Sequence, residues 1–384
     1  MALPPLRPSF HLAAAAFALI LICCTTTDAA RDQYNAIDEC WRWNPKWQSD
    51  RQRLATCSVG FAGKMIGNIG PGLTHYKVTD PGDNPLDPKP GTLRYGASVV
   101  KGKVWITFQR NVRMRIKLEK PLLVGSFTAI DGRGASVNIA GGACLLLHKV
   151  SNVIIHGLRI HHCRSEGAGP VMGPEGKIVQ MGAVDGDAIR MVESRKVWID
   201  HNTLFRCEDG LIDVTRGSTA ITISNNWFRN HNKVMLLGHD DAFVLDSKMR
   251  VTVVFNHFGP RCFQRMPRVR HGFAHVVNNV YQGWEKYAIG GSMNPSVKSQ
   301  SNLFIAPESG SKQVTWGHGG KPMNFQSVGD LFENGALFNT PIEARRIVRP
   351  HYNREQSFPV ADAKSVRSLT SSSGALRCPR FSRC

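Results

Sequence analysis

Apolar residues alternate with other residues in a set of short segments through the middle of the chain. Four segments, at residues 197–204, 221–228, 251–258 and 274–281, have apolar residues at i and i+2, Asn at i+5 and a large apolar residue at i+7. A weaker copy ends at residues 302–304, and an earlier one at 153–158 has Leu in place of Asn. Alternation with a period of two predicts half-buried strands. Asn suits the turn after each strand because it tolerates left-handed backbone and hydrogen-bonds to nearby backbone.

The recurring asparagines are separated by 24, 30, 23 and 23 residues along the series Asn202, Asn226, Asn256, Asn279 and Asn302. Spacing of this length, without helical patterning between the copies, is typical of a solenoid of stacked coils. An antiparallel sandwich is the alternative, with turns about every 8–12 residues. The pattern favours an all-β fold, a right-handed parallel β-helix in which the asparagines stack as an internal ladder. Insertions between copies are expected on one binding face.

The two ends of the chain are less regular. We expect one domain over residues 30–384. Residues 34–64 look helical, and the segment 30–75 is predicted to cap the open apolar end of the solenoid, as terminal repeats must. From about residue 306 to 384 the pattern predicts polar loops, with a flexible tail at 365–373.

The N-terminus has the pattern of a secretory signal peptide. Arg7 precedes an apolar run at residues 11–24, and small residues follow up to Ala29 and Ala30, where we expect cleavage after a signal of residues 1–29. The alternative, a membrane anchor, needs about 20 apolar residues. We therefore expect a secreted protein of the extracellular space or cell wall, without membrane attachment after processing.

Cysteine usage agrees with an oxidising compartment, which permits disulfides. Of ten cysteines, Cys23 and Cys24 lie in the predicted signal. Sequence proximity suggests three pairs, although sequence alone does not fix connectivity: Cys40 with Cys57, Cys144 with Cys163, and Cys378 with Cys384. Cys207 and Cys262 remain, either paired or as free thiols.

The formal net charge is +19. A basic secreted protein suggests a polyanionic partner. The secretory route argues against nucleic acid, whereas an acidic polysaccharide fits both charge and compartment. The alternative is a basic surface that serves solubility or wall adhesion. We expect the protein to act as a monomer.

Carboxylates recur at the coil spacing. Asp209 follows Asp185 by 24 residues, about one turn of the predicted solenoid, and Asp187 and Asp213 lie close to each of them. Carboxylates one coil apart become neighbours, and their repulsion calls for a cation. Hard oxygen ligands without a Cys/His set indicate calcium. For any single Asp, an ordinary acidic loop residue is the alternative.

Basic residues follow these carboxylates. Lys233 lies 20 residues after Asp213, and Arg265, Arg268 and Arg270 flank Pro267. Proline interrupts a strand, so the guanidinium groups of Arg265 and Arg270 can reach one site. Arginine suits a bidentate grip on a carboxylate. A solvated basic stripe is the alternative.

At this point the sequence resembles the plant pectate lyases, a family of the pectate lyase superfamily. The resemblance extends over essentially the whole chain after the signal. It is carried by the stretches PGTLRYG at 90–96, IDGRG at 130–134, DGDAI at 185–189, VWIDHN at 197–202, DGLID at 209–213, VMLLGH at 234–239, QRMPR at 264–268 and AIGGS at 288–292. Residues 259–263, GPRCF, depart from the GEGL of many relatives, and so do residues 67–70 from the usual Gly-Gly pair.

The resemblance implies cleavage of de-esterified homogalacturonan (pectate) by β-elimination. It implies calcium at Asp185, Asp209 and Asp213, and we add Asp187 from its position. It implies that Arg265 is the catalytic base and that Lys233 and Arg270 hold substrate carboxylates. We expect Arg268 to belong to the same substrate-binding surface.

The implied reaction removes the C5 proton, alpha to a carboxylate, and expels the C4 oxygen. A guanidinium is ordinarily protonated, so Arg265 needs neighbouring cations to act as a base, and an alkaline activity optimum follows. The alternatives are a β-helix hydrolase with paired acids and no calcium, a non-catalytic pectate-binding wall protein, and a pectin lyase that prefers methyl esters.

Overall fold

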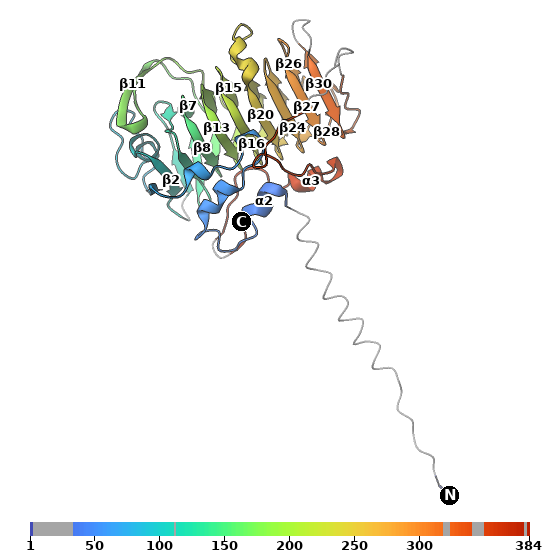
Figure 1. Ribbon diagram of the computed structural model, residues 1–384, viewed down its shortest axis with the longest axis horizontal. Helices are drawn as coiled ribbons and strands as arrows, with labels where there is room; N and C mark the ends of the chain where they lie inside the picture. The colour runs from blue at the N-terminus through green and yellow to red at the C-terminus, as the bar shows by residue number, and fades with distance from the viewer. Residues whose placement is uncertain (3–33, 111–112, 318–322, 340–348, 380–381) are drawn as a thin grey trace.

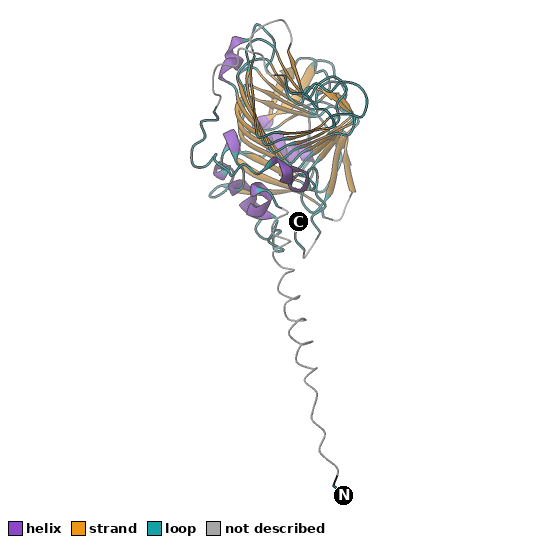
Figure 2. Ribbon diagram, turned by 90° about the vertical axis from the view of Figure 1, so that its right-hand side faces the viewer, coloured by secondary structure: helices purple, strands orange, loops and turns teal. Residues whose placement is uncertain are grey.

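The computed structural model describes residues 1–2, 34–110, 113–317, 323–339, 349–379 and 382–384. The signal predicted at residues 1–29 lies almost wholly outside this range. Strands wind around the long axis of the molecule and short helical segments lie outside them (Figures 1 and 2). Within the described residues, no helix is long and apolar enough to cross a bilayer.

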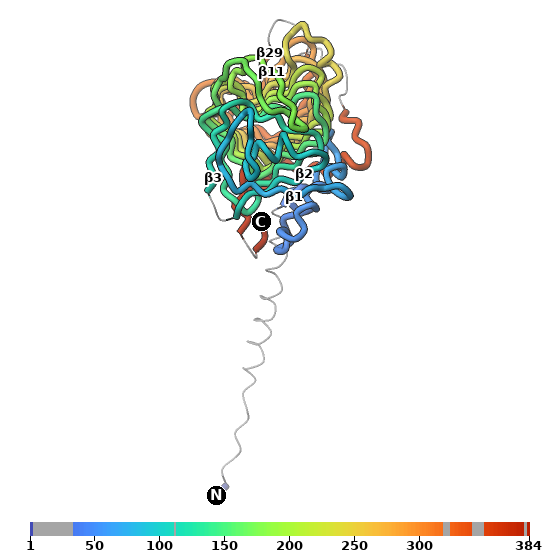
Figure 3. The backbone as a smooth tube through the Cα atoms, turned by 90° about the vertical axis from the view of Figure 1, so that its left-hand side faces the viewer, coloured from blue at the N-terminus to red at the C-terminus, as the bar shows by residue number. Residues whose placement is uncertain are grey.

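Three parallel sheets run along the axis, and the chain visits each in turn. One coil consists of β13 in the ten-stranded sheet, β14 in the nine-stranded sheet and β15 in the eight-stranded sheet, after which β16 pairs with β13. An end view shows β1 and β2 on one side of the coil and β3 on another (Figure 3). The fold is the predicted parallel β-helix.

The strands have the following bounds. The ten-stranded sheet contains β1 (Leu73–Val78), β2 (Lys103–Phe108), β5 (Thr128–Asp131), β8 (Ser151–His156), β13 (Arg195–Asp200), β16 (Thr219–Ser224), β20 (Arg250–Val254), β24 (Phe273–Val277), β27 (Ser296–Gln300) and β30 (Asn324–Val328). The nine-stranded sheet contains β3 (Arg113–Ile116), β6 (Ser136–Ala140), β9 (Arg159–His161), β14 (Thr203–Phe205), β17 (Trp227–Arg229), β21 (His257–Phe258), β25 (Val280–Gln282), β28 (Leu303–Ile305) and β31 (Leu331–Glu333). The eight-stranded sheet contains β4 (Leu122–Leu123), β7 (Leu145–His148), β12 (Ile189–Val192), β15 (Ile212–Thr215), β19 (Met235–Leu237), β23 (Arg268–Val269), β26 (Ile289–Gly291) and β29 (Thr315–Gly317).

Smaller elements decorate this coil. Two further pairs of strands are the antiparallel β10 (Gly169–Gly173) and β11 (Lys177–Met181), and the parallel β18 (His231–Lys233) and β22 (Cys262–Gln264). The helical segments are α2 (Ala36–Trp41), η1 (Arg51–Thr56), η2 (Gly60–Ala62), η3 (Ile66–Asn68), η4 (Tyr95–Val99), η5 (Pro174–Gly176), η6 (Val244–Lys248), η7 (Ala363–Ser365) and α3 (Val366–Leu369).

The predicted asparagine ladder is present at the turn between the ten-stranded and nine-stranded sheets. Each side-chain amide donates to the Oδ1 of the next, from Asn202 to Asn226 at 3.1 Å and onward through Asn256 and Asn279 to Asn302. Asp330 accepts from Asn302 and ends the ladder. The left-handed backbone lies at the residue before each asparagine, such as His201 with φ of 54°, because the asparagine itself is committed to the ladder.

The large apolar residue at i+7 also stacks from coil to coil. The rings of Phe228, Phe258, Tyr281 and Phe304 lie 4.9, 4.7 and 4.5 Å apart between successive centroids. These rings belong to one buried core inside the coil. Because these equivalent positions stack from coil to coil, a one-residue slip of a strand would turn its ring outward. The stack therefore fixes the register of the sheets.

The N-terminal helical segment covers the outer face of the ten-stranded sheet, whereas we expected it to cover the open end. Trp41 and Trp47 pack in a second apolar cluster against Trp105 and Trp198 of that sheet. The open end is covered by η4, whose Ala97 belongs to the main core. The ten-stranded sheet has apolar residues on its outer face, and the N-terminal segment buries them. This explains why the segment lies on the side of the solenoid and not at its end.

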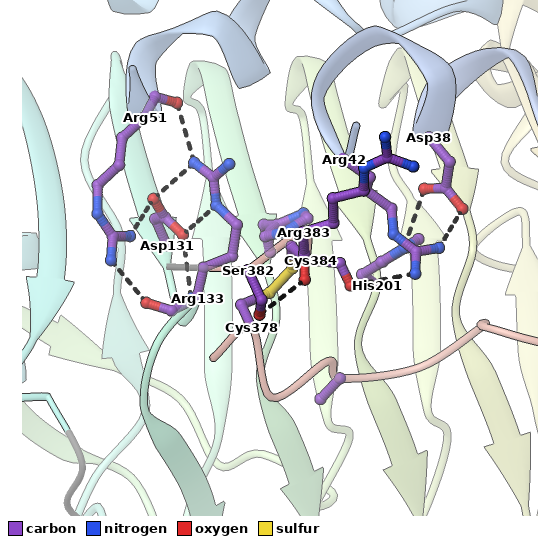
Figure 4. Close-up of a disulfide and its surroundings, with 12 residues drawn as sticks. Asp38, Arg42, Arg51, Asp131, Arg133, His201, Cys378, Ser382, Arg383 and Cys384 are labelled. Atoms are coloured by element: carbon purple, nitrogen blue, oxygen red, sulfur yellow. Dashed lines mark hydrogen bonds and ion pairs between the residues drawn. A yellow bond between two sulfur atoms is a disulfide. The ribbon is translucent and has the colours of Figure 1, made fainter. Parts of the chain in front are cut away.

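Buried ion pairs tie this N-terminal segment to the sheet (Figure 4). Arg133 grips Asp131 through two nitrogens at 2.8 Å, and Arg51 binds the same carboxylate at 2.7 Å. Burial alone would raise the pKa of Asp131, but the two guanidinium charges outweigh it and hold that pKa far below its ordinary value. Asp38 also lies 3.1 Å from Nε2 of His201, but burial lowers the pKa of His201 to about 3, so the imidazole is neutral and this contact is not an ion pair. The IDGRG and VWIDHN stretches therefore build the fold.

The C-terminal region is more regular than the predicted loops. Strands β29, β30 and β31 extend all three sheets beyond residue 306. Val366 of α3 packs on Val280 and Leu303, on the outer face of the nine-stranded sheet. Further on, the N–H of Gly374 donates to the carbonyl of Asn225 at 2.7 Å. The polar sequence of this region gave no signal for the few apolar and backbone contacts that hold it in place.

All three cysteine pairs suggested by sequence proximity form disulfides: Cys40–Cys57, Cys144–Cys163 and Cys378–Cys384. Cys207 and Cys262 are free thiols. Burial raises the pKa of both thiols to about 12, so neither is an effective nucleophile.

Candidate active site

The candidate site lies on the segments that lead from the nine-stranded to the eight-stranded sheet. Asp185 and Asp187 precede β12, Asp209 precedes β15, and Lys233 ends β18 in the next coil. Arg265 lies one coil further on, between β22 and β23, and Lys233 is paired in register with its neighbour Gln264. Stacking of equivalent segments brings these residues together.

Three carboxylates form a tight group. One oxygen from each of Asp185, Asp187 and Asp209 lies within 4.8 Å of the others. Asp185 is exposed, Asp209 is partly buried and Asp187 is buried. Asp213, which the resemblance implied as a ligand, lies beside this group on β15 but outside it. Asp187, which we added from its position, lies inside it.

Gly210 brings Asp187 and Asp213 close to one another. A Cβ atom on Gly210 would lie 2.3 Å from Oδ1 of Asp213 and 2.8 Å from Oδ1 of Asp187. Burial and then the charges of Asp213 and Asp185 raise the pKa of Asp187 to about 9. Burial and then the charge of Asp209 raise the pKa of Asp213 to about 7. The repulsion among these carboxylates favours the binding of a cation.

The donor set fits a calcium ion. Oδ2 of Asp187 is buried and has no hydrogen-bond partner among the described residues. An orphaned buried carboxylate oxygen is costly, and coordination of a hard cation by several carboxylates satisfies it.

Two basic side chains flank the carboxylates. Arg190 places Nη1 3.0 Å from Oδ1 of Asp185 and 3.9 Å from Oδ2 of Asp187. On the other side, the ammonium of Lys233 donates a hydrogen bond to Oδ1 of Asp209. His231 lies on the same strand as Lys233 and its Nε2 lies 2.6 Å from the carbonyl oxygen of Asp209. Asp209 is thus positioned by the coil that follows it.

The three arginines converge on Tyr287. The charges of Arg268, Arg265 and Arg270 all act on the phenol, so the three guanidinium groups lie near it. Burial raises the pKa of Tyr287, and these three arginines oppose that rise. The phenol therefore stays neutral and can share its oxygen with a guanidinium. Nε of Arg265 is buried without a hydrogen-bond partner among the described residues.

The two outer arginines have other partners as well. Arg268 lies on β23, and its Nη2 lies 3.4 Å from Oγ of Ser292. Arg270 donates from Nη1 to the carbonyl of Gly238 at 3.0 Å and lies 3.3 Å from Asp241. Arg270 is therefore held at the loop that follows β19.

A row of side chains crosses the eight-stranded sheet beside the site. Arg190 pairs in register with Asp213, Asp213 with Leu236, and Leu236 with Arg268. Next to this row, a hollow of about 470 Å³ is lined by Arg206, Asp209, Lys233, Arg261 and Phe263, among others. The hollow shares Asp209 and Lys233 with the candidate site.

Sequence reasoning missed Arg190, His231 and Tyr287. The coil spacing carries a signal for Arg190, because it stands 23 residues before Asp213 and is its register partner. His231 could have been found from Lys233, since residues i and i+2 of a strand share a face. Tyr287 carries no such signal, because only the folded coil brings it to the arginines.

Comparison with known proteins agrees with this architecture. The pectate lyase family model matches residues 111–377. Probable pectate lyase 4 of Arabidopsis thaliana is 51% identical over 355 residues, which cover 91% of this chain and 90% of that protein. The pectate lyase of Zinnia elegans is 46% identical, with 91% of this chain and 87% of that protein covered.

A solved structure matches as well. The chain is similar to Jun a 1, the major allergen from cedar pollen, with a TM-score of 0.85 and 46% identity over 89% of this chain and 99% of that one. Sequence similarity and fold both extend over the strands and loops that build the candidate site. The chain therefore belongs to the pectate lyase family.

Proposed function

We propose that this protein cleaves pectate, the de-esterified galacturonate polymer, by calcium-dependent β-elimination, giving 4,5-unsaturated oligogalacturonides. The observation that carries the proposal is the carboxylate group with its orphaned Asp187 oxygen, beside cations contributed by the following coils. A site with this excess of negative charge would hold calcium through Asp185, Asp187 and Asp209, with Asp213 next to them.

Calcium bound there would supply positive charge that acidifies the C5–H of a uronate whose carboxylate it contacts. Lys233 and Arg270 are proposed to hold substrate carboxylates and to stabilise the negative charge that develops as C5 loses its proton. Lys233 is well placed because its side chain is 41% exposed and already in contact with Asp209. Arg268 is proposed to contribute to the same surface.

Arg265 is proposed as the base. Its charge acts on both Asp213 and Arg268, so its guanidinium lies close to the carboxylates and to the other arginines. The proton would pass from C5 to the guanidine, while the electron pair of the C5–H bond forms the C4–C5 double bond and the C4–O bond breaks. The C4 oxygen leaves on the departing chain fragment and takes a proton from solvent.

The test is the ultraviolet absorbance of unsaturated products, followed on polygalacturonate and on highly methylated pectin, each with calcium or with chelator. We expect product on polygalacturonate only when calcium is present. Reducing ends without absorbance would indicate a hydrolase and would overturn the proposal. Product on methylated pectin with chelator would indicate an ester-preferring lyase instead.

Variants at the base separate catalysis from binding. Arg265→Lys keeps a cation but loses the planar guanidinium and its reach, and we expect at least a 100-fold loss of kcat. If Arg265→Ala retains activity, Arg265 is not the base. A polymer-binding protein without catalysis would show calcium-dependent binding but no product in the unaltered chain.

We also propose that the protein is secreted into the cell wall and acts there as a monomer on pectate. The three disulfides support an oxidising compartment. Expression in plant tissue followed by mass spectrometry of the wall fraction tests this, with a mature N-terminus expected at residue 30 or 31. An intracellular chain that keeps residues 1–29 would contradict it.

A further inference from the structure

A second basic surface lies outside the candidate active site, on the outer face of the nine-stranded sheet. Alternation along the first strands turns Arg113 and Arg115 of β3, Asn138 of β6, and Arg159 and His161 of β9 outward, whereas the residues between them are buried. None of these outward side chains is acidic. Among the described residues, no carboxylate lies within 4 Å of the Arg113, Arg115 or Arg159 guanidinium.

Register places these side chains in a row across the strands. Arg115 pairs with Asn138, and Asn138 pairs with Arg159. Neighbouring strands lie about 4.8 Å apart, so the two arginines stand two spacings, on the order of 10 Å, from each other. The row therefore alternates cation, amide and cation along the solenoid axis, which suits an extended polymer that carries carboxylates at regular intervals.

The row lines a hollow of about 610 Å³, with Arg377 of the C-terminal segment contributing another cation. Arg159 is held in place by neutral acceptors, the carbonyl of Ala375 at 3.2 Å and Oγ of Ser136 at 3.4 Å. Burial and the charges of Arg377, Arg113 and Arg229 lower the pKa of Arg159. These cations repel each other, and a bound anion would relieve that repulsion.

Part of the same face is covered at its other end. The apolar residues Val280 and Leu303, on the later strands, are covered by Val366 of α3. The basic part of the face lies away from this cover, and it is on a different sheet from the row Arg190–Asp213–Arg268. A ligand on one sheet leaves the other free.

We propose that the outer face of β3, β6 and β9 is a second, non-catalytic binding site for an acidic polysaccharide chain. The choice of a polyuronate among acidic polysaccharides rests on the proposed function. The basic face is observed independently of that function. Two sites on one molecule would keep the protein on a polymer between cleavage events, because the second contact acts at high effective concentration. Attraction between exposed charges would weaken as salt is raised.

The experiment measures binding of the full-length secreted protein to polygalacturonate by affinity electrophoresis in chelator, which removes the calcium-dependent contribution of the active site. The test variant is the double change Arg115→Gln and Arg159→Gln, which keeps polar side chains. The matched control is Arg354→Gln with Lys101→Gln, which removes the same charge from exposed residues outside this face. The kcat/KM on trigalacturonate, with calcium, is measured in parallel.

We expect the test variant to bind polygalacturonate at least fivefold more weakly than the unaltered protein, with kcat/KM on trigalacturonate unchanged. Equal weakening in the control variant would mean that net charge alone is responsible and would overturn the proposal, as would unchanged binding in the test variant. Equally tight binding of DNA would also overturn it. Since binding is read without catalysis, an absence of lyase activity would refute the proposed function and leave this measurement interpretable.

Discussion

The ammonium group of Lys233 donates a hydrogen bond to the carboxylate of Asp209, which lies one coil earlier in the solenoid. Asp209 also belongs to the carboxylate group with Asp185 and Asp187. Lys233 and a calcium ion would therefore compete for the charge of Asp209. The same lysine is proposed to bind the substrate, so its effects on metal affinity and on catalysis should have opposite signs.

Replacing Lys233 by Met should separate these two effects. We expect calcium to bind with equal or severalfold higher affinity, because the competing ammonium is gone, while kcat/KM on polygalacturonate falls at least 100-fold. Isothermal titration calorimetry and the ultraviolet assay measure the two quantities. Lys89→Met, at an exposed lysine with its own carboxylate partner, is the control and should change neither. A large loss of calcium affinity in Lys233→Met would show that the lysine organises the site and does not compete for it.

The effect of calcium on stability should depend on pH. The pKa is raised to about 9 at Asp187 and to about 7 at Asp213. A group whose pKa is raised by folding stabilises the folded chain at low pH, and this contribution is lost as pH rises through the folded-state pKa. The metal-free protein should therefore lose stability from these groups as pH rises from about 4 to 9. Calcium needs the ionised carboxylates, so the increase in Tm that it causes should be larger at pH 9 than at pH 6.

Differential scanning fluorimetry at both pH values, with calcium or chelator, measures this increase. Asp187→Asn should reduce it and remove most of its pH dependence, whereas Asp87→Asn, at a carboxylate that is 71% exposed, should behave like the unaltered protein. An increase in Tm of the same size at pH 6 and pH 9 would contradict the expectation.

Gly210 should tolerate no side chain. The added Cβ of Gly210→Ala would stand 2.3 Å from Oδ1 of Asp213, so the carboxylate must move. Overpacking costs about 1–3 kcal/mol of stability, and we expect calcium affinity to fall at least tenfold. Gly182→Ala is the control, because a Cβ there has no atom within 4 Å. Titration calorimetry with calcium and urea unfolding measure the two effects, and normal calcium affinity in Gly210→Ala would show that the site relaxes around the methyl group.

Spacing along the chain predicted much of this arrangement. The 24-residue intervals from Asp185 to Asp209 and from Asp209 to Lys233 each equal one coil, so stacking brings them together. The sequence did not predict that Trp41 and Trp47 cover the side of the solenoid. Their apolar character predicts that they are buried, but it does not identify the surface against which they pack. It also left Tyr287 out, since its proximity to the arginines arises only when the segments before β23 and β26 stack in the folded coil.

Some of the sequence stretches that carry the family resemblance stabilise the fold, although they could be mistaken for catalytic motifs. Asp200 of the VWIDHN stretch accepts from Ser224 at 2.6 Å and contacts His156 at 2.9 Å, all in the buried interior. Such a network is costly to break, which gives these residues a structural role independent of the reaction. Arg133 and Asp131 hold the N-terminal segment in the same way.

The asparagine ladder should carry a large share of the stability of the central coils. The side chain of Asn256 donates to the carbonyl of Ile223 at 2.8 Å and to Asn279, and its oxygen accepts from the backbone N–H of Asn226 at 2.9 Å. Asn256→Ala leaves these buried groups without partners, and each unsatisfied group costs about 1–3 kcal/mol. We expect the free energy of unfolding to fall by about 3 kcal/mol or more.

Urea unfolding followed by circular dichroism measures this loss. Asn232→Ala, at an exposed side chain that accepts from Gln264 at 3.0 Å, should cost under about 0.5 kcal/mol. Asn256→Asp keeps the acceptor for Asn226 but replaces the donor to Asn279 by a second acceptor, so it should be at least as damaging as alanine at neutral pH. A loss below about 1 kcal/mol in both Asn256 variants would mean that neighbouring coils re-pair their backbone without the ladder, and that strand pairing alone sets the stability of the solenoid.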